Sequence, residues 1–223
     1  MGFDDHGGPL PTHLWGILAE WNRPAGRGQW QAQLGLGAGP RLDARGLRPA
    51  EAVEPGGGGR EALGLSWNWL PDAFGTDLLG LHAAYARIPS TAAGLRELRQ
   101  ASLGLFLDRG LGPSRWLADT LLLHHRAVTP TGVLRRWHGG AYLQVERAGG
   151  RWRPYARLER NVLDGEDPYW SLFPEVLTRR AVGGLRLELG EHHALAVEAG
   201  VGRELGGHRW RRGWRVQWSA LLP

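Results

Sequence analysis

Arginine and glutamate recur at every second position in parts of the last third of the sequence, which would place them on one face of extended strands. The residues of this set are Arg151, Arg153, Arg157, Glu159, Arg186, Glu188, Glu198 and Arg215. A guanidinium group is always charged and binds oxyanions with a forked geometry, so such arginines lining a pore would favour anions. The interleaved glutamates allow a second interpretation, in which cross-strand ion pairs stiffen the wall.

The histidines do not form a clear metal site. His124-His125 and His192-His193 are adjacent pairs, and neighbours on a strand point to opposite faces, so neither pair can share one ion. His6 and His13 lie near acidic residues, and loop geometry could bring them together, but solvated loop histidines are the simpler interpretation. We therefore expect no metal and no cofactor.

Signals for catalysis are weak, and we expect no enzyme. No serine lies in a Gly-x-Ser-x-Gly elbow, and the glycine run at 56–59 lacks the lysine and helix of a phosphate-binding loop. One minor alternative stays open: a barrel enzyme acting on lipid, with His124 or His125 paired with Ser114.

A mixed arginine and tryptophan segment at 209–215, together with the net charge of +5, raises the question of nucleic-acid binding. At the end of a strand the same mixture serves as an anchor against anionic lipid headgroups. We favour the anchor and expect no nucleic-acid partner.

The elements that would position these residues are strands, because apolar residues recur with a period of two along most of the chain. Clear alternation covers 29–37, 63–69, 101–107, 141–146, 185–189, 195–201 and 214–222. Weaker segments at 12–21, 77–87, 115–127 and 151–160 complete about eleven strands, although a helix would also fit 115–127. Strands of roughly ten residues are long enough to cross a bilayer at a tilt.

The connections differ in length in a way that is typical of outer-membrane barrels, which have short turns at one end and long loops at the other. Short turns are expected at 148–150 and 190–192, and long loops at 38–60, 88–96 and 162–178. Uneven loops also occur in other meander proteins, so this feature alone does not decide the class.

Composition excludes some classes and leaves the barrel open. The 223 residues include no cysteine, which excludes disulfides and thiolate sites, and no run approaches the roughly 20 apolar residues of a membrane helix. Most of the 12 tryptophans lie near strand ends, as in an aromatic girdle, and many of the 35 glycines fall on the other face, where a crowded barrel interior needs room. A soluble barrel or sandwich with the tryptophans inside is the alternative.

Two segments resemble bacterial outer-membrane porin-like proteins. The opening segment 3–16 contains the pattern Gly-Gly-x-x-Pro-x-His, which in those proteins leads from a loop into a barrel strand. The segment 182–222 is similar to the closing strands of porins. In that family the opening pattern follows a signal peptide and earlier strands, and the chain ends in an aromatic residue. This chain begins with the pattern and ends in Leu221-Leu222-Pro223.

The sequence therefore predicts an all-β protein, an antiparallel transmembrane β-barrel formed by a meander of about 11–12 strands. We expect 1–223 to be a single domain that lacks upstream strands and a signal peptide. The resemblance implies a channel in the bacterial outer membrane for passive diffusion of small solutes or ions, with a preference for anions. It also implies as partners the lipid bilayer, lipopolysaccharide, the barrel-assembly machinery and small anionic or polar solutes, and leaves an oligomer open. The alternative is a soluble β-barrel that binds a hydrophobic ligand.

Overall fold

The computed structural model describes residues 15–43, 46–48, 60–147, 149–190, 193–206 and 209–220. Most of these residues lie in strands. Eleven of the strands form one sheet in which each strand pairs with its neighbour in sequence, apart from a small separate hairpin inserted after the second strand. The predicted fold class, an antiparallel all-β meander of about 11–12 strands, is confirmed.

The strands of the main sheet are long, and two of them reach 16 residues. Their bounds are β1 Trp15–Ala25, β2 Gly28–Ala38, β5 Glu61–Leu70, β6 Leu78–Pro89, β7 Glu97–Leu111, β8 Ser114–Thr129, β9 Gly132–Arg147, β10 Trp152–Val162, β11 Leu177–Glu188, β12 His193–Glu204 and β13 Trp210–Ala220. The separate hairpin consists of β3 Arg41–Asp43 and β4 Gly46–Arg48.

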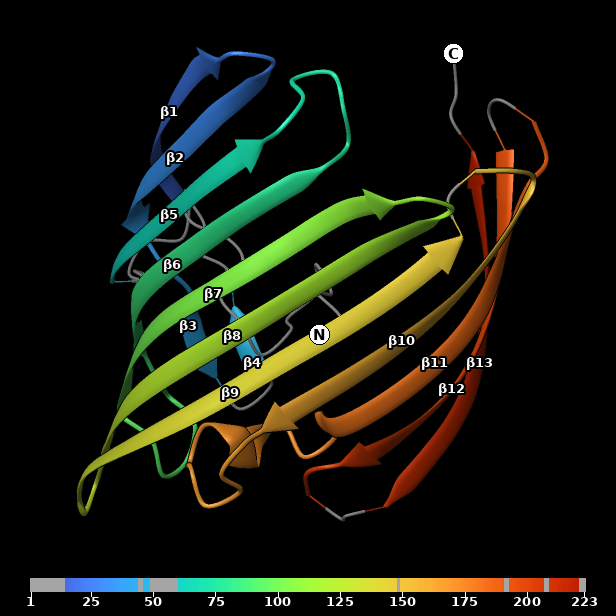
Figure 1. Ribbon diagram of the computed structural model, residues 1–223. Coiled ribbons are helices and arrows are strands. Elements are labelled where there is room, and N and C mark those ends of the chain that lie inside the picture. The colour runs from blue at the N-terminus through green and yellow to red at the C-terminus, as the bar shows by residue number, and fades with distance from the viewer. Residues whose placement is uncertain are drawn as a thin grey trace.

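The sheet curves like the wall of a barrel, with β1 and β13 at its two edges (Figure 1). The described residues contain no pairing between these two edge strands. Register is regular throughout, with one irregularity in the pairing of β11 with β12, between Leu177 and Arg179. Regular register keeps the side chains of one face in continuous rows from strand to strand.

The segment 115–127, which could also have been a helix, is part of strand β8 and pairs on both sides. Its run of three leucines fits a strand because the two faces have different surroundings. Leu123 is fully buried on the concave face, whereas Leu122 is 47% exposed on the convex face. Both faces therefore accept leucine at this end of the sheet.

The connections at the two ends of the sheet differ as predicted. At one end, here called the turn end, short connections such as 26–27, 112–113 and 148–151 join the strands. At the other end, here called the loop end, lie the long connections 39–60, 90–96 and 163–176. Two connections do not follow this division: the tight turn 130–131 lies at the loop end, and 71–77, which is as long as 90–96, lies at the turn end. The first of these contains β3 and β4, and the last contains a short 3-10 helix, η1 Trp170–Leu172.

The only buried cluster of apolar side chains in the described chain lies at the loop end. It combines concave-face residues of β6–β8, including Ile88, Leu98 and Leu123, with residues of the long loops. The loop residues are Leu42, Leu47, Ala92, Leu95, Tyr169, Trp170 and Phe173. The long loops thus fold against the concave face and pack there as a plug.

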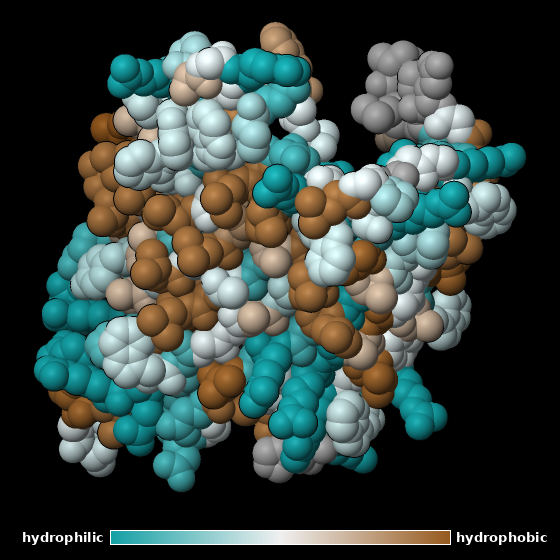
Figure 2. Space-filling model, in the orientation of Figure 1, coloured by the Kyte–Doolittle hydropathy of each residue, from teal (hydrophilic) through white to brown (hydrophobic). Residues whose placement is uncertain are grey.

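The convex face is apolar and exposed. Eight of the tryptophans are exposed by more than a third, among them Trp137, Trp214 and Trp218, and so are many strand leucines such as Leu158. Figure 2 shows hydrophobic side chains gathered across the middle of the view, with hydrophilic ones concentrated above and below. Trp170 is the one tryptophan in the buried core of the described residues, so the soluble alternative with tryptophans inside loses its premise.

No helix among the described residues is long and apolar enough to cross a membrane.

Candidate functional site

The register of β8–β13 brings one residue from each of six strands into a row on the concave face, and five of these residues have polar side chains. Directly opposed neighbours along this row are Arg115, Glu146, Tyr155, Gly184, Glu198 and Arg215. A second row, one pleat nearer the turn end, contains Arg153 opposite Arg186. A third row, nearer the loop end, contains Arg157 opposite Gln144.

These rows enclose a polar groove of about 420 Å³. Its charged lining consists of Arg115, Glu146, Arg153, Arg157, Arg186, Glu198 and Arg215, so five arginines face two glutamates and the formal charge of the lining is +3. Of the predicted pore-lining residues, Arg153, Arg157, Arg186, Glu198 and Arg215 meet in this groove. Glu159 and Glu188 lie beside it as partners of its arginines, and Arg151 lies in the turn before β10, outside the lining.

Tyr155 crosses the middle of the groove, over Gly184 on the next strand. A Cβ atom at Gly184 would collide with the Tyr155 ring, so the glycine leaves the space in which the ring lies. The Tyr155 hydroxyl then reaches past β11 and donates a hydrogen bond to Glu198 Oε1 at 2.5 Å. Glycines make room for rings on this face elsewhere too, at Gly80 for Phe106 and at Gly104 for His82.

Two carboxylates beside the groove are each shared between two arginines. Glu188 contacts Arg186 at 2.9 Å and Arg153 at 3.5 Å. Glu159 lies 2.8 Å from Arg157 and 3.6 Å from Arg180. Each of these carboxylates therefore serves two guanidinium groups. Asp108 also binds Arg115, at 2.6 Å from two guanidinium nitrogens. The charge of +3 therefore holds for the lining alone, and it falls to +1 when Asp108, Glu159, Glu188 and Arg180 are counted with it.

The loop 163–176 is held to the concave face by a buried cluster of His125, His138 and Asp167, which sequence analysis missed. Asp167 Oδ2 lies 2.9 Å from His125 Nδ1 and 2.8 Å from His138 Nε2. Asp167 Oδ1 accepts the backbone N–H of Tyr169 at 2.8 Å. All three side chains are at most 2% exposed.

Asp167 is the hydrogen-bond acceptor at the centre of this cluster. Burial alone would raise the pKa of Asp167, but the hydrogen bonds from His125 and His138 hold it well below its usual range, so the carboxylate only accepts. The far nitrogen of His125 faces the Gln100 amide nitrogen at 3.1 Å, and that of His138 accepts the Asp164 N–H at 3.2 Å.

The donor types of this cluster would suit a zinc ion, since the three ligand atoms lie within 4.8 Å of one another. In the present arrangement, however, both nitrogens that face Asp167 are hydrogen-bonded to its Oδ2, and the opposite nitrogens face Gln100 Nε2 and the Asp164 N–H. The chemistry of the cluster is therefore that of a loop anchor. The segment with His6 and His13, the weaker metal candidate, lies outside the described residues.

The lipid-hydrolase alternative is not assembled by the fold. Ser114 begins β8 at the turn end, whereas His124 and His125 lie ten residues further along the same extended strand. At about 3.3 Å per residue this separates them by roughly 30 Å. His124 instead packs against Trp137 on the convex face, with 4.6 Å between ring centroids.

The long antiparallel sheet, with one exposed apolar face and one polar concave face, is similar in fold to the wall of an outer-membrane channel. One solved structure similar to this chain is the outer membrane channel DcaP of Acinetobacter baumannii, with a TM-score of 0.56 and 12% sequence identity. The alignment covers 91% of this chain and 61% of that channel. No protein-family model matches the sequence, and no curated protein matches it significantly.

At 12% identity this likeness concerns the fold. It supports the porin-like β-barrel fold that the sequence resemblance implied, in its general form. The segment that carried much of that resemblance is described only from Trp15 onward, and the final three residues also lie outside the described part.

Proposed function

We propose that this chain forms the wall of a porin-like channel in a bacterial outer membrane, through which small solutes or ions diffuse passively. The observation that carries the proposal is the contrast between the two faces of the sheet. Large apolar side chains such as Leu158 (64% exposed) and Trp214 (79% exposed) cover the convex face, and charged groups cover the concave one. In water such an exposed apolar face would promote aggregation, whereas a membrane-spanning wall requires an apolar face toward the lipid.

Strand length and aromatic position support the same proposal. Strands of 10–16 residues in the main sheet are long enough to cross the hydrocarbon core at a tilt. Trp30, Trp67 and Trp69 cluster near the turn end, with ring centroids 4.6 and 5.8 Å apart, and Trp137 and Trp210 lie toward the loop end. Indole rings at both boundaries of an apolar band are typical of a membrane-spanning barrel.

The channel prefers anions in this proposal, because the lining of the groove has a formal charge of +3 and the carboxylates Glu159 and Glu188 beside it are each shared between two arginines. Arg215 strengthens this preference, since it faces the groove and takes part in none of the ion pairs formed among described residues. Selectivity would arise from wall charge and pore width, so neither a cofactor nor a catalytic group is needed.

The test is the reversal potential of the purified protein in a planar bilayer under a salt gradient. Replacing Arg153 and Arg157 together with glutamine removes two groove charges and should shift the reversal potential toward cation permeability. The matched control replaces Arg23 and Arg109, which lie on the convex face near the turn end. An unchanged reversal potential in the first variant, with channels still open, would rule out the anion preference.

A further inference from the structure

Arginines on the convex face lie directly opposite one another on neighbouring strands near the loop end. Arg160 on β10 faces Arg179 on β11, which in turn faces Arg203 on β12. These three residues are here called the arginine row. A second pair, Arg126 opposite Arg135, occupies the equivalent end of β8 and β9. Like charges directly opposite each other on a sheet repel, so each of these contacts destabilises the sheet unless an anion lies between them.

The protein supplies such an anion at one place and not at the arginine row. Arg87 faces Arg99 across β6 and β7, and Glu97 binds both, at 2.7 and 2.9 Å. None of the ion pairs formed among described residues involves the arginine row or the pair on β8 and β9. Arg160 and Arg179 are exposed, so their guanidinium groups are accessible from outside.

An apolar groove begins next to the arginine row on the same face. Two residues along each strand from these arginines lie Leu158, Ala181 and Val201, which line a surface groove of about 740 Å³. Its floor continues over the small residues Ala156, Gly183 and Ala199, and Trp214 borders it on β13. Around Gly183 the space is open, because a Cβ atom there would meet nothing within 4 Å.

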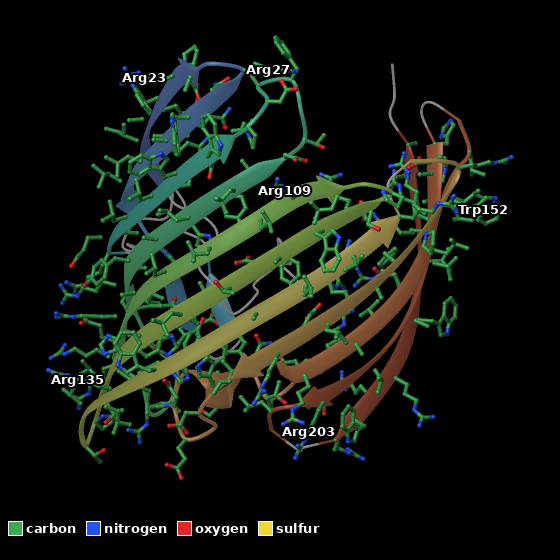
Figure 3. The ribbon with its side chains drawn as sticks, in the orientation of Figure 1. Arg23, Arg27, Arg109, Arg135, Trp152 and Arg203 are labelled. Carbon is green, nitrogen blue, oxygen red and sulfur yellow. The ribbon has the colours of Figure 1, made fainter. Side chains whose placement is uncertain are left out.

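The position of the row matches the boundary of the apolar band. Arg203 faces Trp210, an exposed indole on the edge strand. In Figure 3, Arg203 and Arg135 both lie at the lower end of the molecule, whereas Arg23 and Arg109 lie toward the opposite end. Arg23 and Arg109 are directly opposite tryptophans, so no arginine faces another there.

From this juxtaposition we infer a binding site for a phosphorylated lipid of the membrane, with its phosphate groups on the arginine row and an acyl chain in the adjoining groove. Guanidinium forks bind phosphate oxygens in pairs, and closely spaced arginines suit a headgroup with more than one phosphate. The apolar groove selects an amphiphile over a free anion. This inference rests on the proposed membrane location of the channel and adds a specific lipid partner to it.

The test is titration of the detergent-solubilised protein with lipid A that carries two phosphates, read by native mass spectrometry. The variant R160Q/R179Q/R203Q should lose binding at least about tenfold, as the loss of charge-assisted hydrogen bonds implies. Gly183→Leu, which fills the groove without changing charge, should also weaken binding. The matched control R23Q/R109Q/R147Q removes three convex-face arginines near the turn end and should bind like wild type.

Two ligand arms separate the lipid from other anions. Dephosphorylated lipid A should bind weakly, and inorganic pyrophosphate should not compete. Competition by pyrophosphate, an equal loss in the control variant, or wild-type binding no stronger than that of phosphatidylcholine would each overturn the inference. If binding fails while conductance in phosphatidylcholine bilayers is normal, only the lipid site is wrong. If neither the wild type nor the variant R160Q/R179Q/R203Q conducts ions, the proposed channel function itself is wrong.

Discussion

At the scale of single residues, Tyr155 and Gly184 show how the concave face is ordered. The ring occupies the space that a side chain at Gly184 would take, and its hydroxyl holds Glu198 on the next strand but one. We predict that Gly184→Val displaces the ring and lowers the free energy of unfolding by about 1–3 kcal/mol, the usual cost of overpacking. Urea unfolding measures this change.

The matched control for that variant is Gly183→Val, one residue earlier on the convex face, where an added Cβ atom meets nothing within 4 Å. It should leave stability unchanged or raise it slightly, because valine favours strands. A double variant with Tyr155→Ala should recover most of the loss at Gly184. Equal losses at both glycines would contradict the role given to Tyr155.

Asp167 is the second residue whose chemistry can be tested directly. Asparagine replaces one carboxylate oxygen with an NH2 donor, so it cannot accept the two histidine N–H groups on one side and the Tyr169 N–H on the other, and Asp167→Asn should lower the free energy of unfolding by about 1.5–3 kcal/mol at neutral pH. Asp72→Asn is the control, since Asp72 also accepts a backbone N–H two residues on, in an exposed turn. It should cost much less.

The pH dependence of this loss follows from the lowered pKa of Asp167. A group whose pKa is lower in the folded protein stabilises above its unfolded pKa, and this stabilisation disappears as pH falls through the folded value. The stability difference between wild type and Asp167→Asn should therefore be constant from neutral pH to about pH 5 and shrink in stronger acid. A difference that grows on acidification would contradict a charged Asp167.

At the scale of elements, the loop 163–176 acts as a plug over the concave face at the loop end. Tyr169 and Trp170 are at most 1% exposed and belong to the buried cluster. We predict that Trp170→Ala lowers the free energy of unfolding by about 3–5 kcal/mol and raises single-channel conductance, because the loop loosens. Phe74→Ala, at a fully exposed aromatic in a turn-end connection, should change neither quantity.

The elements themselves were largely predictable. The alternation of apolar and polar residues predicted the strands, because in a membrane barrel lipid and lumen favour different side chains at alternate positions. The helix alternative for 115–127 arose because Leu121 and Leu123 face a packed interior at the loop end instead of an open lumen. The hairpin β3–β4 and helix η1 were not predicted, since short segments of this kind are stabilised by packing against distant strands.

For the candidate site, the sequence predicted which face of its strand a residue lies on, but not which residues of other strands and loops it contacts. Alternation placed Arg153, Arg157 and Arg186 together correctly, but Arg115 lay in the ambiguous segment and was missed. The cluster of His125, His138 and Asp167 joins two strands and a loop across 42 residues, and local sequence contains no signal for such a contact. The arginine row likewise appears only once strand register is known.

At the scale of the whole molecule, the proposed function depends on which solvent each face of the sheet meets. In the proposed channel, the exposed apolar convex face meets lipid, and the concave face with its charged groove meets water. A soluble ligand-binding protein would require the opposite arrangement, with the apolar face packed inside. The environments of alternate residues on a single strand therefore distinguish a membrane-spanning wall from a soluble ligand-binding protein. Because the sequence has no cysteine, a single cysteine can be introduced and labelled at any one position.

The most direct measurement is a cysteine scan of β10 from Tyr155 to Glu159, with a nitroxide label in liposomes. Accessibility to oxygen, which is enriched in lipid, and to a water-soluble nickel complex should alternate with a period of two. Labels at Ala156 and Leu158 should respond to oxygen, and labels at Tyr155, Arg157 and Glu159 to nickel. Loss of alternation, or nickel access at Leu158 with none at Arg157, would contradict a membrane-spanning wall.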